Sequence, residues 1–219
     1  MMLQFHEIIP SIPFLLEGTL VTLKYTGFSL FFGLILGVVF ALGKTSKHFI
    51  FRAIADIYTS IFRGTPLLVQ LSIVYFATPQ IFNYDISAFQ AGLIAFSLNS
   101  GAYVSEIIRA GIQAVDRGQF EAAKSLGIPD SYAMKDIIMP QAVKNILPAL
   151  VNEAVNLLKE SALVSVIGEM DLLRRANVVS SEKYLYFEPL IFVALIYYIL
   201  VMILSQLALL LEKRFRRSD

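Results

Sequence analysis

The sequence predicts an all-helical membrane protein, a single domain of five transmembrane segments. Of its 219 residues, 57% are hydrophobic and 16% are charged, and the mean hydropathy is +0.68. Apolar runs of roughly 20 residues, long enough to cross about 30 Å of hydrocarbon, recur along the chain. The charged residues gather between these runs, which is typical of a polytopic membrane protein and not of a soluble domain.

The sequence marks the five predicted spans with unequal clarity. They cover residues of about 18–43, 62–82, 86–110, 144–168 and 188–211. The first is a largely uncharged run in which Lys24 can reach an interface by snorkelling. Pro66 lies where the second begins, and a proline is tolerated in a first helical turn. The fifth is the clearest, whereas the fourth is interrupted by Glu153, Lys159 and Glu160, so that hydropathy alone would nearly miss it.

Lysine and arginine residues predict the orientation of the chain, because those near span ends are retained on the cytoplasmic side. They follow the first and third spans and fill the C-terminal tail, whereas the N-terminus and residues 79–85 have none. The exceptions, after the fourth span, are Arg174, Arg175 and Lys183. We therefore predict the N-terminus outside and the C-terminus in the cytoplasm, without a cleaved signal peptide.

Two helix faces inside the predicted spans carry polar side chains. On the third span these are Asn99, Ser100, Tyr103 and Glu106, and on the fourth they are Glu153, Asn156, Glu160 and Ser161. The spacings i, i+4, i+7 and i, i+3, i+7 place most members of each set on one side of a helix. An ionisable residue at membrane depth is costly and normally faces a bundle interior or a water-filled cavity. The two faces therefore predict a path for a polar solute.

A simpler interpretation of the same polar residues is structural. Asparagine and tyrosine commonly join neighbouring helices within a membrane. Glu106 could pair with Arg109 one turn later, and Lys159 could be a partner of Glu153. The sequence leaves both interpretations open.

The connection between the third and fourth spans, about residues 112–141, carries helix signals of its own. Its marked positions are Glu121, Ala122, Ala123, Gly127 and Pro140. Gly127 suits the residue after a helix end, and Pro129 can begin a second short helix. The pattern predicts a helix-turn-helix outside the membrane. Alternatively, Phe120, Ala123 and Leu126 could form the apolar side of a surface helix resting on the bilayer or on the protein itself.

Three stretches together resemble the permease subunits of ATP-binding-cassette (ABC) importers for polar amino acids. They are AYVSEIIRAGIQAVDRGQFEAAKSLG (102–127), FRGTPLLVQL (62–71) and LVSVIG (163–168). The resemblance extends from Gly18 to the basic tail and is nearest to glutamine-type permeases. The sequence departs from the usual pattern at Pro129 and at Lys159-Glu160-Ser161, the second departure lying beside the presumed substrate face.

The resemblance implies a type I ABC importer permease fold with a cytoplasmic coupling helix, in a bacterial inner membrane and surrounded by lipid. It implies a path completed by an identical or related permease, a separate ATPase that binds ATP and Mg²⁺, and a periplasmic or surface-tethered amino-acid-binding protein. Carried over by motif position, Glu121 would meet the ATPase, Ala122 and Ala123 would allow close approach, and Gly127 would make the turn. Pro140 belongs to the end of the same motif.

We predict that the chain is not an enzyme and binds no cofactor itself. Gly43-Lys44-Thr45 ends like a phosphate-binding loop, but Val38 occupies the position where that motif needs glycine. The sequence has no cysteine, and its net charge of +1 excludes a strongly basic nucleic-acid binder. Two alternatives remain, an ion-coupled secondary transporter that uses the intramembrane glutamates and a membrane scaffold that only recruits an ATPase.

Overall fold

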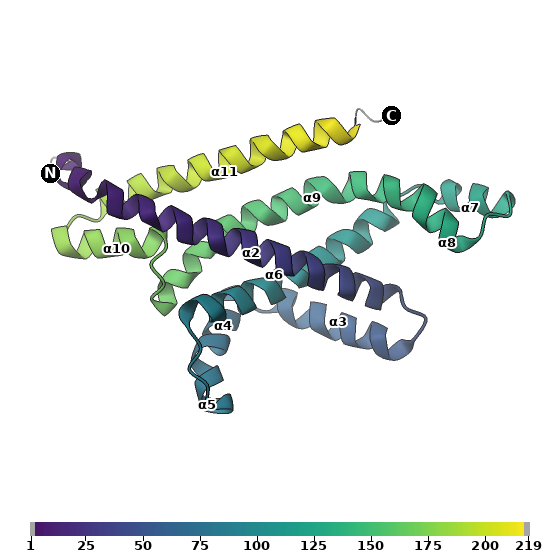
Figure 1. The fold of residues 1–219 in the computed structure, drawn as a ribbon, viewed down its shortest axis with the longest axis horizontal. Coiled ribbons are helices and arrows are strands. Elements are labelled where there is room, and N and C mark those ends of the chain that lie inside the picture. The colour runs from purple at the N-terminus through teal and green to yellow at the C-terminus, as the bar shows by residue number, and fades with distance from the viewer. Residues whose placement is uncertain (1–2, 217–219) are drawn as a thin grey trace.

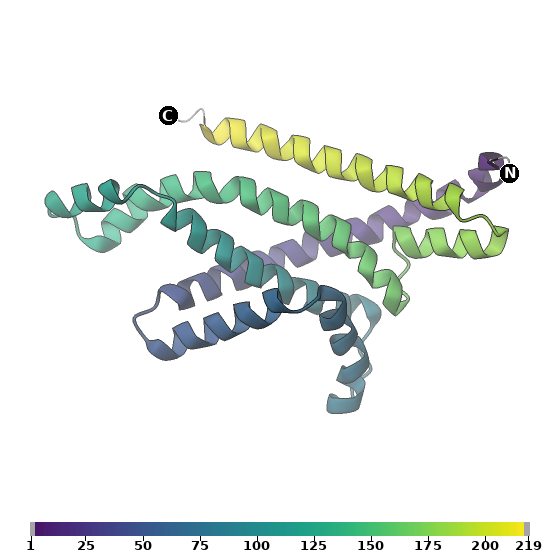
Figure 2. The same ribbon diagram turned by 180° about the vertical axis from the view of Figure 1, so that it is seen from behind.

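The computed structural model describes residues 3–216, and the side chains of residues 3–210, as an elongated bundle of helices (Figure 1). No strand occurs among residues 3–216, so the all-helical prediction is confirmed. The N-terminal helix and the end of the last helix lie at opposite ends of the bundle (Figures 1 and 2). The loop at residues 46–48 and the hairpin near residues 117–138 lie toward the same end as the last turn of the final helix. The connections predicted to be cytoplasmic therefore share one end.

The helices α2 (Ile12–Thr45) and α6 (Ala88–Gln113) pack against each other along much of their length. Glycine permits their close approach, because a Cβ on Gly33 would lie 2.8 Å from the Cβ of Ser100. A short helix, α1 (Phe5–Ile8), and one 3₁₀ turn (Ile9–Ser11) precede α2. A capping box between Ser87 and Gln90 begins α6.

The chain turns sharply after α3 (Phe49–Gly64), which lies against α2 and α6. Next come α4 (Leu67–Ser72), a π-helical stretch (Ile73–Ala77) and α5 (Thr78–Phe82). The part before the break at residues 65–66 and the part after it differ in direction by 103°. Residues 62–82, predicted as one span, therefore lie across a break and not in one continuous helix. Pro66 explains the position of this break, because proline disfavours helical backbone in the residue before it.

A helical hairpin connects α6 to the long helix α9 (Met139–Glu160) and protrudes from one end of the bundle (Figures 1 and 2). It consists of α7 (Arg117–Ser125), α8 (Asp130–Tyr132) and a π-helical stretch (Ala133–Ile138) that runs into α9. Gly127 has a φ of +74°, and the amide of Ile128 bonds the carbonyl of Ala123 at 3.0 Å. This hydrogen bond closes a Schellman turn, as glycine at this position predicted.

After α9 a 3₁₀ stretch (Ser161–Ile167) leads to α10 (Leu172–Lys183) and α11 (Phe187–Arg216). Arg175 of α10 donates to Glu17 of α2 at 2.7 Å and to the carbonyl of Phe14 at 2.9 Å. Its guanidinium also lies 4.5 Å from the centroid of the Phe14 ring. Arg175, an exception to the charge pattern of the other connections, thus has a fixed structural partner that the sequence did not reveal.

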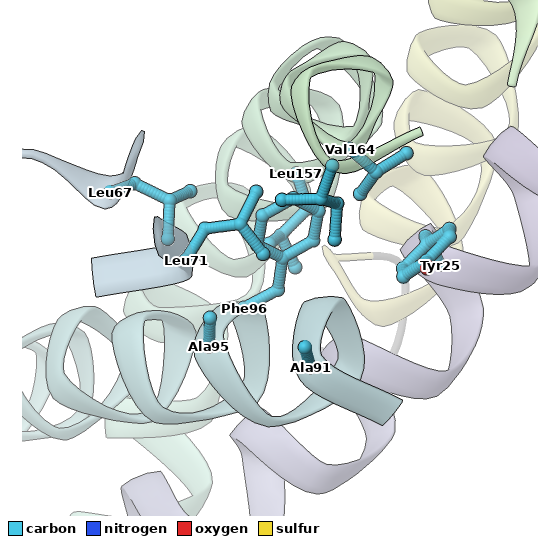
Figure 3. Packing of buried hydrophobic residues seen from close by; sticks show 9 residues of the cluster. Tyr25, Leu67, Leu71, Ala91, Ala95, Phe96, Leu157 and Val164 are labelled. Carbon is cyan, nitrogen blue, oxygen red and sulfur yellow. The ribbon is translucent and has the colours of Figure 1, made fainter. Parts of the chain in front are cut away.

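Three hydrophobic clusters hold the described bundle together. The largest joins α2, α4, α6, α9 and the 3₁₀ stretch around Tyr25, Leu71, Phe96 and Leu157 (Figure 3). A second packs α10 against α2 and α11, and a third packs the hairpin against α6 and α9. Because the helices with polar faces, α6 and α9, take part in the first and third clusters, these clusters connect the predicted path to the hairpin.

Within the described part of the chain, three helical segments are long and apolar enough to span a membrane, namely Phe5–Thr45, Ala88–Gln113 and Phe187–Leu210. The bent pair Phe49–Gly64 and Leu67–Phe82 would make a fourth if it forms one broken span. The predicted fourth span, 144–168, corresponds to α9 and the 3₁₀ stretch and does not meet the same test of hydropathy and charge. The exact membrane boundaries of all five spans stay predictions.

Candidate functional site

Glu106 lies at the centre of an ion cluster that joins α2, α3 and α6. Its carboxylate accepts from Arg109 at 2.7 and 3.0 Å and from the ammonium of Lys44. Arg63 of α3 approaches to 3.6 Å, and Lys44 also lies 3.4 Å from Asp56. The structural alternative considered for Glu106, pairing with Arg109, is thus present, and it extends to two further helices. With three cations around it, the Glu106 carboxylate is largely neutralised by the chain itself.

Asn99 is buried, and its side chain connects α6 to the break between α3 and α4. Its Nδ2 donates to the carbonyl of Phe62 and to Oε1 of Gln70, each at 3.0 Å. The Nε2 of Gln70 lies within hydrogen-bonding distance of the Phe62 and Thr65 carbonyls and of the Thr65 hydroxyl, at 2.8–3.0 Å. The structure therefore places Asn99 within a network of protein partners, which fits the structural interpretation that the sequence left open beside a place in the solute path.

Tyr103 is the most exposed of the predicted path residues on α6. The guanidinium carbon of Arg63 lies 5.4 Å from the centroid of its ring, within the range of a cation–π interaction. Ser100, by contrast, is fully buried in the crossing with α2, opposite Gly33. Of the polar residues predicted on this helix, Tyr103 and part of Glu106 are therefore accessible in the single chain.

On α9 the predicted polar face divides into buried and exposed residues. Asn156 and Glu160 are exposed, and so is Lys159 beside them. Glu153 is buried, while Ser161 is fully buried and donates to the carbonyl of Leu158 at 2.7 Å. Asn156 and Glu160 are thus accessible to a solute or a second chain, whereas Ser161 stabilises the turn that ends α9.

The hairpin exposes only part of its predicted contact motif. Glu121 and Ala122 are exposed on α7, whereas Ala123 is 2% exposed and faces the chain's own core. Phe120 packs into the third cluster, and Leu126 at the tip is 78% exposed. The prediction that Ala123 allows close approach of a partner does not fit its burial, because α7 packs against the adjacent π-helical stretch.

Comparison with known proteins identifies the class of this molecule. Residues 33–217 match the family described as the inner membrane component of binding-protein-dependent transport systems. The chain belongs to this family. Its members are permease subunits of ABC transporters, so the chain is a transporter subunit and not an enzyme. This confirms the importer prediction over a secondary transporter or a scaffold.

Relatives of this permease carry names that refer to different amino acids. The chain is 61% identical over 205 residues to a Rickettsia conorii protein named "Putative glutamine transport system permease protein GlnP", with 94% of each chain covered. It is 53% identical over its full length to the "Arginine transport system permease protein ArtQ" of Bacillus subtilis, which is also fully covered.

Solved structures of related permeases match the fold of this one. A structure described as an "amino acid ABC transporter with histidines" matches with a TM-score of 0.94 and 48% identity, covering 98% of this chain and all of the other. A methionine ABC transporter matches with a TM-score of 0.79 at 18% identity, covering 94% and 98% of the two chains, and this shows the fold alone. The type I importer permease fold is thus confirmed.

The permease also contains a buried carboxylate that the sequence analysis did not identify. Asp171 is fully buried and caps α10 by accepting from the amides of Leu173 at 3.2 Å and Arg174 at 2.8 Å. Tyr197 of α11 donates to the same carboxylate. Burial raises the pKa of Asp171 to about 6, although its hydrogen bonds act in the opposite direction. An aspartate directly before a helical run is an N-cap signal that could have marked it.

Proposed function

We propose that this permease forms half of the path by which an ABC importer moves a polar amino acid into the cytoplasm. The observation that carries the proposal is the exposure of Asn156 and Glu160 on α9, within a predicted span. A carboxylate that faced hydrocarbon would be costly, so this face requires a water-filled path or another chain beside it. Tyr103 is the accessible aromatic residue on the neighbouring helix α6, and we include it in the path.

Glutamine is the substrate that we propose first. It is named in several relatives more than 55% identical to this permease, and an amide side chain suits polar groups such as Asn156. Arginine is the second candidate, because one relative is an arginine permease and the exposed Glu160 carboxylate favours a cationic side chain. The two candidates differ in charge, so a competition experiment separates them.

We propose that the hairpin transmits the motion of a separate ATPase, which binds ATP and Mg²⁺, to the membrane helices. Glu121, Ala122 and Leu126 are exposed for docking, and Gly127 makes the turn between α7 and α8. Phe120 anchors the hairpin in the same hydrophobic cluster as Ile138 and Ile146. Because packed side chains transmit displacement and do not compress, a push on α7 would move α9 and the path. Pro140, in the first turn of α9, would continue this rigid connection.

The remaining partners follow from the proposed assembly. A second permease, identical or related, would cover the exposed polar face of α9 and complete the path. An amino-acid-binding protein would deliver the substrate on the side of α10. We propose that the N-terminus lies outside the inner membrane and the C-terminus in the cytoplasm, which agrees with the lysine and arginine residues gathered at the hairpin end.

The experiment that tests this function is uptake into liposomes that contain the permease with its co-purified ATPase. We expect uptake of labelled glutamine only with ATP at the ATPase side and a loaded binding protein at the other. Glu160→Ala should change the ability of arginine, relative to glutamine, to compete. Glu182→Ala, an exposed carboxylate on α10, is the matched control and should leave the competition unchanged. Identical competition profiles for wild type and Glu160→Ala would show that Glu160 has a packing role and does not select the substrate.

A further inference from the structure

The break between α3 and α4 leaves backbone groups that cannot bond within a helix. The two parts meet at 103°, and the residues at the end of α3 have no following turn to pair with their carbonyls. In a membrane protein such groups need internal partners, because no water is available in hydrocarbon to replace them. Here the carbonyls of Phe62 and Thr65 accept from side-chain amides.

These amides come from two residues that also bond to each other. Asn99 reaches Phe62 from α6, and Gln70 reaches both Phe62 and Thr65 from α4. Asn99 donates to Gln70 at 3.0 Å, and the two residues are only 5% and 7% exposed. Three helices are thereby held in one arrangement at the point where the chain changes direction.

The residue next to Phe62 is Arg63, in the last turn of α3 immediately before this break. Arg63 is the cation of the ion cluster that lies against Tyr103, and its side chain is 44% exposed. Lys44 and Arg109 hold Glu106 at shorter distances than the 3.6 Å that separates Glu106 from Arg63. The Glu106 carboxylate therefore satisfies Arg63 only in part, and the guanidinium can still attract an anion beside Tyr103.

We infer that Asn99 and Gln70 are positioning residues that fix the α3–α4 break and so hold Arg63 beside Tyr103, where the carboxylate of the amino acid would pass. The role of Arg63 in this inference rests on the proposed function, whereas the fixing of the α3–α4 break by Asn99 and Gln70 does not. Asn99 then acts through the backbone of Phe62 and not by contact with the substrate. Both amides are required, because Gln70 alone reaches the Thr65 carbonyl, whereas Asn99 alone joins the Phe62 carbonyl and Gln70 to α6.

The structural part can be measured directly, because the natural sequence contains no cysteine to remove. Spin labels at Ile57→Cys and Phe82→Cys, two exposed positions on either side of the break, report its geometry by pulsed electron resonance. An excess of unlabelled permease dilutes the label, so that distances between two copies do not contribute. We expect one narrow distance distribution in the otherwise wild-type chain.

Asn99→Leu and Gln70→Met, which keep approximate side-chain size, should each broaden this distribution. The double variant should be no broader than the worse single variant, since both act on the same break. Ser97→Ala is the matched control, a buried polar residue on α6 whose hydroxyl has no hydrogen-bond partner among the described residues. Thr65→Val removes an exposed acceptor of the network and leaves the core intact. Unchanged distributions in every network variant that assembles would overturn the inference.

Transport kinetics test the connection to Arg63. Asn99→Leu and Arg63→Ala should each raise the KM for uptake about tenfold with a smaller effect on maximal rate, and together no more than either alone. If the two increases in KM multiply fully in the double variant, Asn99 does not act through Arg63. That result would overturn this inference and leave the proposed import function intact, because uptake would still require ATP and the binding protein.

Discussion

Tyr197 of α11 donates a hydrogen bond over 3.2 Å to Oδ2 of Asp171, the residue that caps α10. A hydroxyl on the candidate span that is least buried by the chain itself is thus bonded to a fully buried carboxylate in the connection before it. The contact fixes α10 between α11 and α2. It also makes the stability of this end of the permease sensitive to proton concentration.

Asp171 should make folding less favourable as pH rises. Burial raises its pKa from 3.8 to about 6 in the folded chain, so the folded state binds the proton more tightly than the unfolded state. The resulting stabilisation is complete below about pH 4 and is lost as pH rises through about 6. The stabilisation that this pKa shift contributes is at most about 3 kcal/mol.

Asp171→Asn keeps an acceptor for the α10 amides and removes this titration. In detergent, the melting temperature of the wild type relative to Asp171→Asn should fall between pH 5 and pH 7.5. Glu182→Gln, exposed on the same helix, should show no such trend. If the melting temperatures of wild type and Asp171→Asn differ by the same amount at pH 5 and at pH 7.5, the pH dependence does not come from Asp171.

Glu106→Gln should destabilise the permease strongly. The substitution removes the carboxylate that accepts the hydrogen bond of Lys44, whose side chain is 9% exposed, and leaves it only the more distant and largely exposed Asp56. It also weakens the contact with Arg109. Removing one partner of a buried ion pair costs roughly 3–5 kcal/mol. Thermal unfolding in detergent measures the loss, with Glu7→Gln in the exposed pair with His6 as the control.

The double variant Lys44→Met/Glu106→Leu should recover part of this loss, because it leaves no buried charge without a partner. A double variant less stable than Glu106→Gln would indicate that Glu106 stabilises the chain mainly through Arg63 and Arg109.

Substitution by alanine should affect the stability of the permease differently at two glycines of α2. A Cβ on Gly37 meets the side chain of Val104 in the crossing with α6, whereas a Cβ on Gly27 meets no atom within 4 Å. Gly37→Ala should therefore reduce stability by about 1–3 kcal/mol through overpacking. Gly27→Ala should be neutral or more stable by up to about 1 kcal/mol, because alanine favours helix. Equal melting temperatures for the two variants would show that the crossing adapts without strain.

Glu121→Lys should uncouple transport without preventing insertion of the permease into the membrane. The residue is exposed on α7, so reversal of its charge disturbs docking of the proposed ATPase and not the packing of this chain. Co-purification of the ATPase and uptake into liposomes are the measurements, and Glu182→Lys on α10, at the opposite end of the bundle, is the control for co-purification. Normal uptake by Glu121→Lys would show that Glu121 is not needed to couple the ATPase to transport.

Local sequence signals predicted the helical segments and the hairpin well. Gly127 has the positive φ expected at the end of a helix, and Pro129 precedes the next helix as expected. The single run predicted at residues 62–82 is the clearest difference, because the helix begins earlier, at Phe49, and breaks before α4. Hydropathy cannot locate such a break, since both parts are apolar and the change of direction depends on partners in α6.

Site residues were predicted by helix periodicity, which indicates a shared face but not what covers it. Asn99 and Tyr103 were placed on one face, yet Asn99 is buried against the α3–α4 break and Tyr103 is exposed. The partners that decide this, Phe62 and Gln70, lie 37 and 29 residues away in the sequence. Arg63 illustrates the same limit, because its partners, Glu106 and Tyr103, both lie on α6 and no local pattern around Arg63 marks them.

The all-helical class, most of the helical segments, the hairpin and the family can be predicted from the amino-acid sequence, because hydropathy, caps and motifs depend on residues close together in the chain. The exposure of individual polar residues, the break in the second span and the pairing of the charges become visible only in the three-dimensional structure. Lys44 meets Glu106 across 62 residues, and Arg175 meets Glu17 across 158. Such contacts form because packing of the helices brings distant side chains together, and no local pattern encodes that choice.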